Sequence, residues 1–173
     1  MADLLVRLYD LPPLAPAVDA LASAGIHVRR ALAGERPMVA AFARAHGSEA
    51  WAAEAEAAFA RVPVACFVAT AEQAGGGAPA AAGYARTPES LVGFACYEAT
   101  CRNFFGPELV HPERRQRGIG RGLLLSALHA MRAEGYAYAI IGWASSVDFY
   151  RRAVGAIEIE GSEPGIYPPL LVR

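Results

Sequence analysis

Lysine is absent from the sequence, so all 16 basic residues among its 173 residues are arginines. This absence excludes a lysine nucleophile, a Schiff-base lysine and the phosphate-binding lysine of a P-loop. The arginines are balanced by 17 acidic residues, which leaves a net charge of -1. Because binding to nucleic acid draws on an excess of positive charge, we expect no nucleic-acid partner.

Cysteine and histidine are also scarce. The three cysteines are Cys66, Cys96 and Cys101, and an odd number without a secretion signal argues against a disulfide framework. Cys96 and Cys101 have no second cysteine or histidine pair at zinc spacing. The four histidines are scattered and form no HExxH motif. We therefore expect no metal site.

Long hydrophobic runs are missing, although 54% of the residues are hydrophobic. No run approaches the ~18 residues of a membrane span. Near the start, Asp3 precedes the first apolar stretch, Arg7 and Asp10 interrupt it, and no basic segment comes before it, which is unlike a signal peptide. We therefore expect no membrane partner and a cytoplasmic location. A length close to ~150 residues per domain predicts one domain over residues 1–173.

The pattern of apolar residues predicts strands and helices in a mixed order. Strands are expected at residues 4–9, 64–70, 90–99, 104–110, 138–142, 157–160 and 170–172, and helices at 13–24, 37–60, 120–134 and 145–154. The helical segment 37–60 should break near Gly47, with Ser48 capping its second half. Gly106 and Pro107 predict a bulge or an edge within their strand. The alanine- and glycine-rich segment 72–89 is expected to be a long hairpin loop.

One segment joins a strand to a strong helix through a turn that contains Arg115-x-x-Gly118-x-Gly120. Glycines let the backbone approach a ligand closely, and the first N–H groups of a helix have no partner within the helix. Their partial positive charge attracts phosphate, and arginine pairs well with phosphate oxygens. The arginines around the turn are Arg114, Arg115, Arg117 and Arg121. These features predict a pyrophosphate site, and Leu123 excludes a Rossmann fingerprint because it stands where the last glycine would be.

Val110-His111-Pro112, followed by residues 115–120 and an apolar helix, resembles motif A of the GCN5-related N-acetyltransferase (GNAT) superfamily. The strand at residues 91–94 and the Phe149-Tyr150 pair are similar to further features of that family. The resemblance implies the GNAT-like fold class, a mixed α/β fold. Its central twisted sheet would have six to seven strands flanked by helices, with two central parallel strands splayed at the cofactor site.

The resemblance also implies that acetyl-CoA is the cofactor. Leu109 and Val110 would contact the pantetheine arm. The pyrophosphate would be held at the turn by Arg115, Gln116, Arg117, Gly118, Ile119, Gly120, Arg121 and Gly122, mainly through main-chain N–H groups. Trp143 departs from the pattern, because relatives often have an asparagine at this place.

The implied reaction is direct transfer of an acetyl group, in a ternary complex, from acetyl-CoA to the amine of a small molecule or peptide. Tyr150 matches the residue that protonates the leaving thiolate in relatives, and a packing tyrosine on a helix face is the alternative. Glu98, near the end of its strand, is the first candidate for the general base and is expected to face the acceptor cleft. Glu108 is the second candidate. A water chain, or an amine that arrives neutral, would make either carboxylate unnecessary.

Two further points stay open at this stage. A non-catalytic GNAT-fold module that binds acyl-CoA as a sensor or interaction partner is the alternative function, because residues 104–106 hold no acid where some relatives have their base. A homodimer is possible, as in many relatives. Aromatic candidates for the lining of an acceptor pocket are Trp51, Tyr97, Phe104, Phe105 and Tyr167.

Overall fold

The computed structural model describes residues 1–72 and 89–166 of the chain. Along the described chain the elements are β1 (Leu4–Arg7), α1 (Ala15–Ser23), β2 (Ile26–Arg30), α2 (Arg36–His46), α3 (Glu49–Ala58), β3 (Cys66–Glu72), β4 (Glu89–Tyr97), β5 (Phe104–Val110), α4 (Ile119–Ala133), β6 (Tyr138–Ile141), α5 (Val147–Val154) and β7 (Ile157–Glu158). The expected loop after residue 72 and the expected strand at 170–172 lie outside the described residues.

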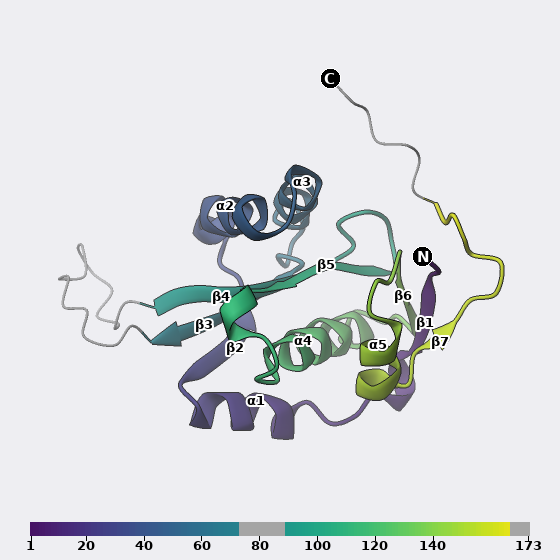
Figure 1. Ribbon diagram of the computed structural model, residues 1–173, viewed down its shortest axis with the longest axis horizontal. Helices are drawn as coiled ribbons and strands as arrows, with labels where there is room; N and C mark the ends of the chain where they lie inside the picture. Colours follow the sequence, from purple (N-terminus) through teal and green to yellow (C-terminus); the bar gives the residue numbers. More distant parts are fainter. Residues whose placement is uncertain (73–88, 167–173) are drawn as a thin grey trace.

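The described strands form one seven-stranded sheet in the order β2-β3-β4-β5-β6-β1-β7. Helices α2 and α3 cover one face, and α1 and α4 lie on the other (Figure 1). Every neighbouring pair is antiparallel except β5 and β6, which are parallel. This arrangement confirms the predicted mixed sheet of six to seven strands with a central parallel pair.

The two parallel strands stay together over a short distance only. Their register joins Phe104 to Ile140 and Phe105 to Ile141, and no later pair is formed. Directly beyond these pairs, Gly106 adopts a φ of 126°, and β5 carries one residue more than β4 between two paired positions. This is the bulge that Gly106 and Pro107 predict, and a bulge bends its strand. The rest of β5 therefore runs apart from β6 and opens the sheet.

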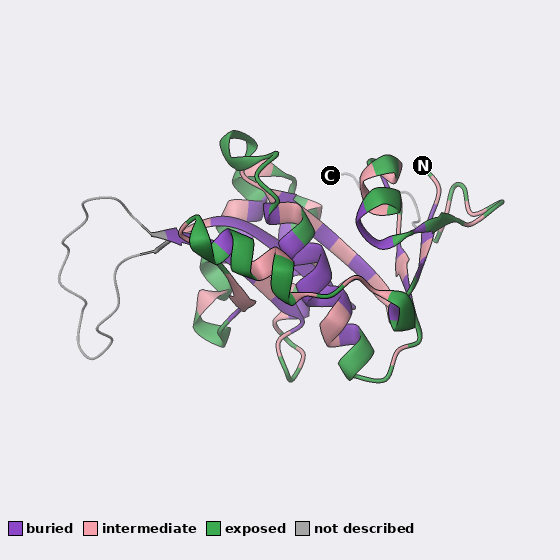
Figure 2. Ribbon diagram, turned by 90° about the horizontal axis from the view of Figure 1, so that it is seen from below, coloured by how far each residue is buried: buried purple, intermediate pink, exposed green. Residues whose placement is uncertain are grey.

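Helix α4 forms the centre of the core. Its apolar face is fully buried against the sheet, with Leu123, Leu124, Leu125, Leu128 and Met131 completely inaccessible. Figure 2 shows the buried residues gathered along this helix and the sheet, and the exposed ones on the outer helix faces. Burying each such side chain stabilises the fold by about 1.5–3 kcal/mol. The buried helix is therefore a rigid support for the turn that precedes it.

Gly93 on β4 allows the sheet and this helix to pack closely. A Cβ atom at this position would lie 2.9 Å from the carbonyl oxygen of Leu109 and 3.1 Å from a methyl carbon of Leu123. Leu109 belongs to β5, which precedes the turn at residues 115–120, and Leu123 belongs to α4, which follows it. The glycine thus sets the distance between β4, β5 and α4.

Some boundaries differ from those expected. Strand β2 was not predicted, because Ile26 is its only buried residue and its sequence lacks the alternation of a half-buried strand. The first strand ends at Arg7, where a 3-10 turn begins. The predicted break in segment 37–60 is confirmed, since Ser48 Oγ accepts the N–H of Trp51 at 3.1 Å and caps α3.

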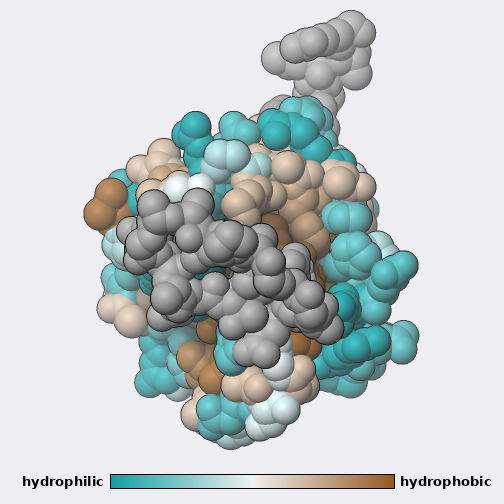
Figure 3. Space-filling model, turned by 90° about the vertical axis from the view of Figure 1, so that its left-hand side faces the viewer, coloured by the Kyte–Doolittle hydropathy of each residue, from teal (hydrophilic) through white to brown (hydrophobic). Residues whose placement is uncertain are grey.

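No helix within residues 1–72 and 89–166 is long and apolar enough to cross a bilayer. Seen from the end of the molecule on the left of Figure 1, hydrophilic and hydrophobic side chains are mixed on the visible surface (Figure 3).

Candidate active site

The turn before α4 has the geometry of an anion site. Gly118 is the N-cap of α4 with a φ of 80°, a conformation that favours glycine, and Gln116 is also left-handed with a φ of 60°. The N–H of Gly122 donates to the carbonyl of Gly118 at 3.0 Å. The amides of residues 119–121 precede this bond and have no acceptor within the helix, so they are available to a phosphate group.

A cavity of about 650 Å³ opens on this turn. Of the predicted cofactor residues, the structure brings eight to its wall: Leu109, Val110, Arg115, Gln116, Gly118, Ile119, Gly120 and Arg121. A Cβ atom on Gly120 would lie 3.3 Å from Oε1 of Glu108 and 3.6 Å from Cζ of Phe149. The glycine therefore keeps space at the start of the helix that a side chain would fill. This cradle and its free amides fit the pyrophosphate of a coenzyme A group.

Two predicted cofactor residues do not line the cavity. Gly122 is buried beneath α1, where a Cβ atom would lie 2.5 Å from a methyl carbon of Leu21, and its amide is used within the helix. Its lack of a side chain thus serves the packing of α1 on α4, and the structure does not bring it to the cavity with the other predicted cofactor residues. Arg117 is exposed and lies outside the lining.

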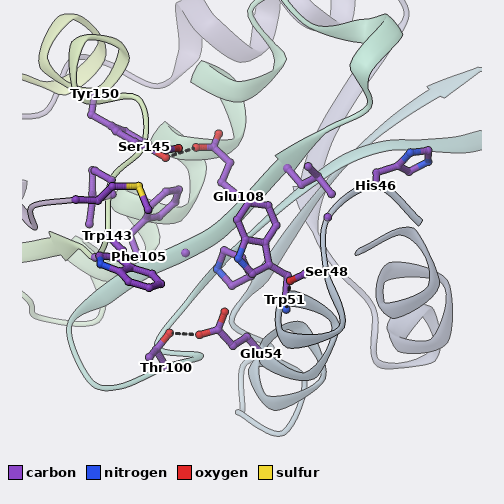
Figure 4. A pocket seen from close by; sticks show the side chains of 18 of the residues that line it. His46, Ser48, Trp51, Glu54, Thr100, Phe105, Glu108, Trp143, Ser145 and Tyr150 are labelled. Carbon is purple, nitrogen blue, oxygen red and sulfur yellow. Dashed lines mark hydrogen bonds between the residues drawn. The ribbon is translucent and has the colours of Figure 1, made fainter. Parts of the chain in front are cut away.

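A second cavity, of about 520 Å³, lies where β5 separates from β6. Its wall comes from the region of α3, from β5, and from the segment between β6 and α5 (Figure 4). The two cavities have six lining residues in common: Trp51, Glu108, Leu109, Arg115, Ser145 and Tyr150. A ligand held at the turn can therefore reach the second cavity past these side chains.

Glu108 and Tyr150 face one another where the cavities meet (Figure 4). The Tyr150 hydroxyl donates to Oε2 of Glu108 at 3.4 Å. Oε1 of Glu108 is buried and has no hydrogen-bond partner in the described part of the chain. Burial raises the pKa of Glu108 to about 8, although the bond from Tyr150 acts in the opposite direction. Burial and the neighbouring carboxylate raise the pKa of Tyr150 well above its ordinary value.

Sequence comparison identifies the family. The family model described as "Acetyltransferase (GNAT) family" matches residues 38–156, more than half of the chain. The chain belongs to this family. No curated protein sequence matched the chain.

Solved structures share the GNAT fold. A glucosamine N-acetyltransferase region in a fungal multi-domain GH3 beta-N-acetylglucosaminidase aligns with a TM-score of 0.67 and 16% identity. A GCN5-related N-acetyltransferase from Sphaerobacter thermophilus aligns with a TM-score of 0.57 and 17% identity, and a Drosophila protein with 0.55 and 13%. Each alignment covers 91% of this chain but only 19%, 48% and 47% of the respective matched chain. At these identities the likeness concerns the fold alone.

Glu98 of this GNAT-family protein lies away from both cavities. Its carboxylate forms an ion pair with Arg61 and accepts the hydroxyl of Tyr136, and it also accepts the N–H of Asn103 at 3.3 Å. The expectation that Glu98 faces the acceptor cleft is therefore wrong. Strand β4 ends at Tyr97, and Glu98 has a φ of 54°, so the alternation of the strand no longer predicts its direction. Its contacts hold the turn between β4 and β5.

The aromatic candidates divide in a similar way. Trp51 and Phe105 line the second cavity of this GNAT-family protein, whereas Tyr97 and Phe104 do not, and Tyr167 lies outside the described residues. Sequence reasoning missed Glu54, which also lines the cavity. Its spacing of three residues from Trp51 places both on one face of α3, and this signal could have found it.

In the ranges 1–72 and 89–166, no three metal-binding side chains gather into a possible metal site.

Proposed function

We propose that the protein transfers an acetyl group from acetyl-CoA to a primary amine. The observation that carries the proposal is the Glu108–Tyr150 pair, which lies where the cavity at the anion-binding turn meets the cavity between β5 and β6. A module that only binds acyl-CoA would have no use for a buried carboxyl group whose Oε1 has no partner in the described structure and whose Oε2 accepts a phenol hydroxyl. The pair therefore favours catalysis over the non-catalytic alternative.

The residues of the first cavity would hold acetyl-CoA. The amides of residues 119–121 and the side chains of Arg115 and Arg121 would bind the pyrophosphate, and the end of β5 at Leu109 and Val110 would contact the pantetheine arm. Because β5 no longer pairs with β6 at Leu109 and Val110, the main-chain groups on this side of β5 are available to the pantetheine arm. When bound, acetyl-CoA supplies a thioester, and transfer forms a C–N bond to the amine as the C–S bond breaks.

Glu108 and Tyr150 would move the protons of this reaction. Oε1 of Glu108 has no partner in the described structure and would accept a proton from the amine nitrogen. The Tyr150 hydroxyl is protonated near neutral pH, so Oη can give a proton to the leaving sulfur. The carboxyl group would then turn about its Cγ–Cδ bond and give this proton to Tyr150, with which Glu108 is hydrogen-bonded. One proton thus passes from the amine to Glu108, one from Tyr150 to the sulfur, and one from Glu108 back to Tyr150, so both side chains regain their starting states.

The pH profile of Glu108→Gln tests this proposal. Since only the ionised carboxylate accepts a proton, and the pKa of Glu108 is about 8, kcat/KM of the unaltered protein should rise up to about pH 8. Removal of a general base lowers the rate by about 10²–10⁴-fold, and the variant should lose the rising limb that Glu108 causes. The measurement is release of free thiol from acetyl-CoA across a panel of amines.

Two outcomes would contradict the proposal. If acetyl-CoA binds tightly but no amine in the panel releases thiol, the protein is a binding module. If Glu108→Gln retains both the rate and the pH profile, then Glu108 is not the base. Glu56→Gln, on the outer side of α3 in an ion pair with Arg44, is the matched control and should leave the rate unchanged.

A further inference from the structure

We infer that the acceptor is a linear aliphatic diamine, whose second ammonium group binds Glu54 while its reacting amine faces Glu108. The inference rests on the proposed function, and it names the substrate class of the same site. Its basis is the charge and the walls of the second cavity. Both carboxylates line the cavity, and in Figure 4 Glu54 and Glu108 lie on opposite sides of Trp51, with Trp143 to one side of them.

Glu54 differs from the other acidic residues of α3. Glu49 and Glu56 both form ion pairs with Arg44, at 3.0 Å and 3.1 Å, away from the cavity. Glu54 lines the cavity, and no arginine, histidine or amino group of the described residues lies within 4.0 Å of its carboxylate. Oε1 accepts the hydroxyl of Thr100 at 2.5 Å, which leaves Oε2 available. A cationic group of a ligand would complete this site.

The walls between the two carboxylates suit methylene groups and a positive charge. Trp51 and Trp143 both line the cavity and are 37% and 45% exposed, so part of each side chain is accessible in its wall. Phe105 lies buried in the same wall. Indole rings attract ammonium groups through their faces and cover aliphatic chains with apolar surface. An extended chain of methylene groups between two nitrogens matches this lining.

The position of Trp143 is fixed by the backbone. Its φ of 51° is rare for a bulky residue, and its N–H donates to Oδ1 of the buried Asp3 at 2.9 Å. Strain of this kind persists where surrounding contacts maintain it. The contact with Asp3 thus fixes the backbone from which the Trp143 side chain reaches the cavity wall.

The cations that line the cavity are engaged elsewhere. The amino group of Met1 forms an ion pair with Glu163. Arg115 lines both cavities, and its Nε donates to the carbonyl of Val110 at 3.3 Å, beside the anion-binding turn. Neither cation satisfies Glu54. An acceptor with a carboxylate at its far end would place like charges together at Glu54, and an uncharged end would leave this carboxylate without a partner.

The test compares matched amines. The diamines from 1,3-diaminopropane to 1,6-diaminohexane are assayed against pentylamine, which has the shape of 1,4-diaminobutane without its second charge, and against 4-aminobutanoate. The second ammonium group of the diamine would form a hydrogen-bonded charge pair with Glu54. We therefore expect kcat/KM for the best diamine to exceed that for pentylamine by about tenfold or more, which is about 1.4 kcal/mol. 4-Aminobutanoate should react more slowly than pentylamine. Equal values for the best diamine and pentylamine would overturn the inference.

Substitutions locate the second ammonium. Glu54→Gln should remove the preference for the diamine over pentylamine through a rise in KM for the diamine. Glu56→Gln, two residues further along α3, should retain the preference. Retention of the preference in Glu54→Gln would contradict the inference, and so would its loss in Glu56→Gln. Melting temperatures of both variants confirm that each is folded.

Calorimetry separates this inference from the proposed function. The best diamine is titrated into the protein without acetyl-CoA, and its affinity should fall by about tenfold in Glu54→Gln and remain in Glu56→Gln. If no amine is acetylated but this binding pattern is found, the proposed function fails and the diamine site stands. If amines are acetylated but diamines bind no better than pentylamine, the proposed function stands and the inference fails.

Discussion

The hydroxyl of Tyr150 lies 3.4 Å from Oε2 of Glu108, although the two residues are 42 positions apart in the chain. Glu108 reaches this place because the bulge at residues 106–107 turns the end of β5 away from β6. Tyr150 reaches it from α5, which follows β6. The divergence of the two strands therefore creates the space in which these side chains meet.

Tyr150→Phe should lower kcat and leave the affinity for acetyl-CoA almost unchanged. The substitution keeps the ring and removes only the proton donor, so the loss belongs to the transition state. General acid catalysis is worth about 10²–10⁴-fold, but a thiolate is a weak base, and we expect a fall of about tenfold or more. Steady-state kinetics and calorimetry make the test. A normal kcat with weakened acetyl-CoA binding would instead make Tyr150 a cofactor contact.

Glu108→Gln should make stability less dependent on pH. The pKa of Glu108 is raised from an ordinary value of 4.5 to about 8 by burial. Between these values the unfolded chain releases the proton that the folded protein keeps, so this group lowers the free energy of unfolding as pH rises. The variant should therefore gain stability relative to the unaltered protein between about pH 5 and pH 8, measured by urea unfolding. A constant difference across this range would contradict the buried state of the carboxyl group.

Gly118→Asp and Gly120→Asp should each weaken acetyl-CoA binding. Both place a side chain and a negative charge at the start of α4, and Gly118 also has a backbone conformation that aspartate adopts at a cost. We expect affinity to fall by at least about tenfold, or about 1.4 kcal/mol, in a calorimetric titration. Gly34→Asp is the control, because no atom lies within 4 Å of a Cβ atom at that position. Unchanged affinity in both folded variants would exclude the turn as the cofactor site.

Gly93→Ala should destabilise the fold. Its Cβ atom would lie 2.9 Å from a backbone oxygen of β5, which cannot move as a side chain can. Overpacking of this kind costs about 1–3 kcal/mol in the free energy of unfolding, measured by urea denaturation. Gly34→Ala should cost much less, since its surroundings are open. Equal stabilities of the two variants would show that β4 and β5 separate easily.

The turn before α4 could be predicted because its parts are adjacent in the sequence. Gly118, Gly120 and the arginines around them define a strand, a turn and a helix within a few residues, and such local patterns specify local structure. The bulge at Gly106 and Pro107 was predicted for the same reason. Both features depend on backbone properties of single residues.

The composition of the second cavity could not be predicted in this way. The sequence favours Glu98 over Glu108 as the base, and it does not reveal the left-handed backbone after β4 that turns Glu98 toward Arg61. Glu54 and Trp143 come from segments far apart in the chain, and the cavity exists only when the sheet has formed. Strand β2 was missed because its side chains are mostly accessible, which leaves little apolar pattern to detect.

The place of β1 in the sheet affects how the protein is made. Leu4 pairs with Ile141 on one side and with Glu158 on the other, so the strand near the start of the chain is enclosed by two of the last to be synthesised. During synthesis, Leu4 and Val6 have neither partner strand until β6 and β7 have been made. Contacts of such long range slow folding and leave an apolar strand available to wrong partners in the meantime. Late pairing of β1 during folding is thus a consequence of this strand order.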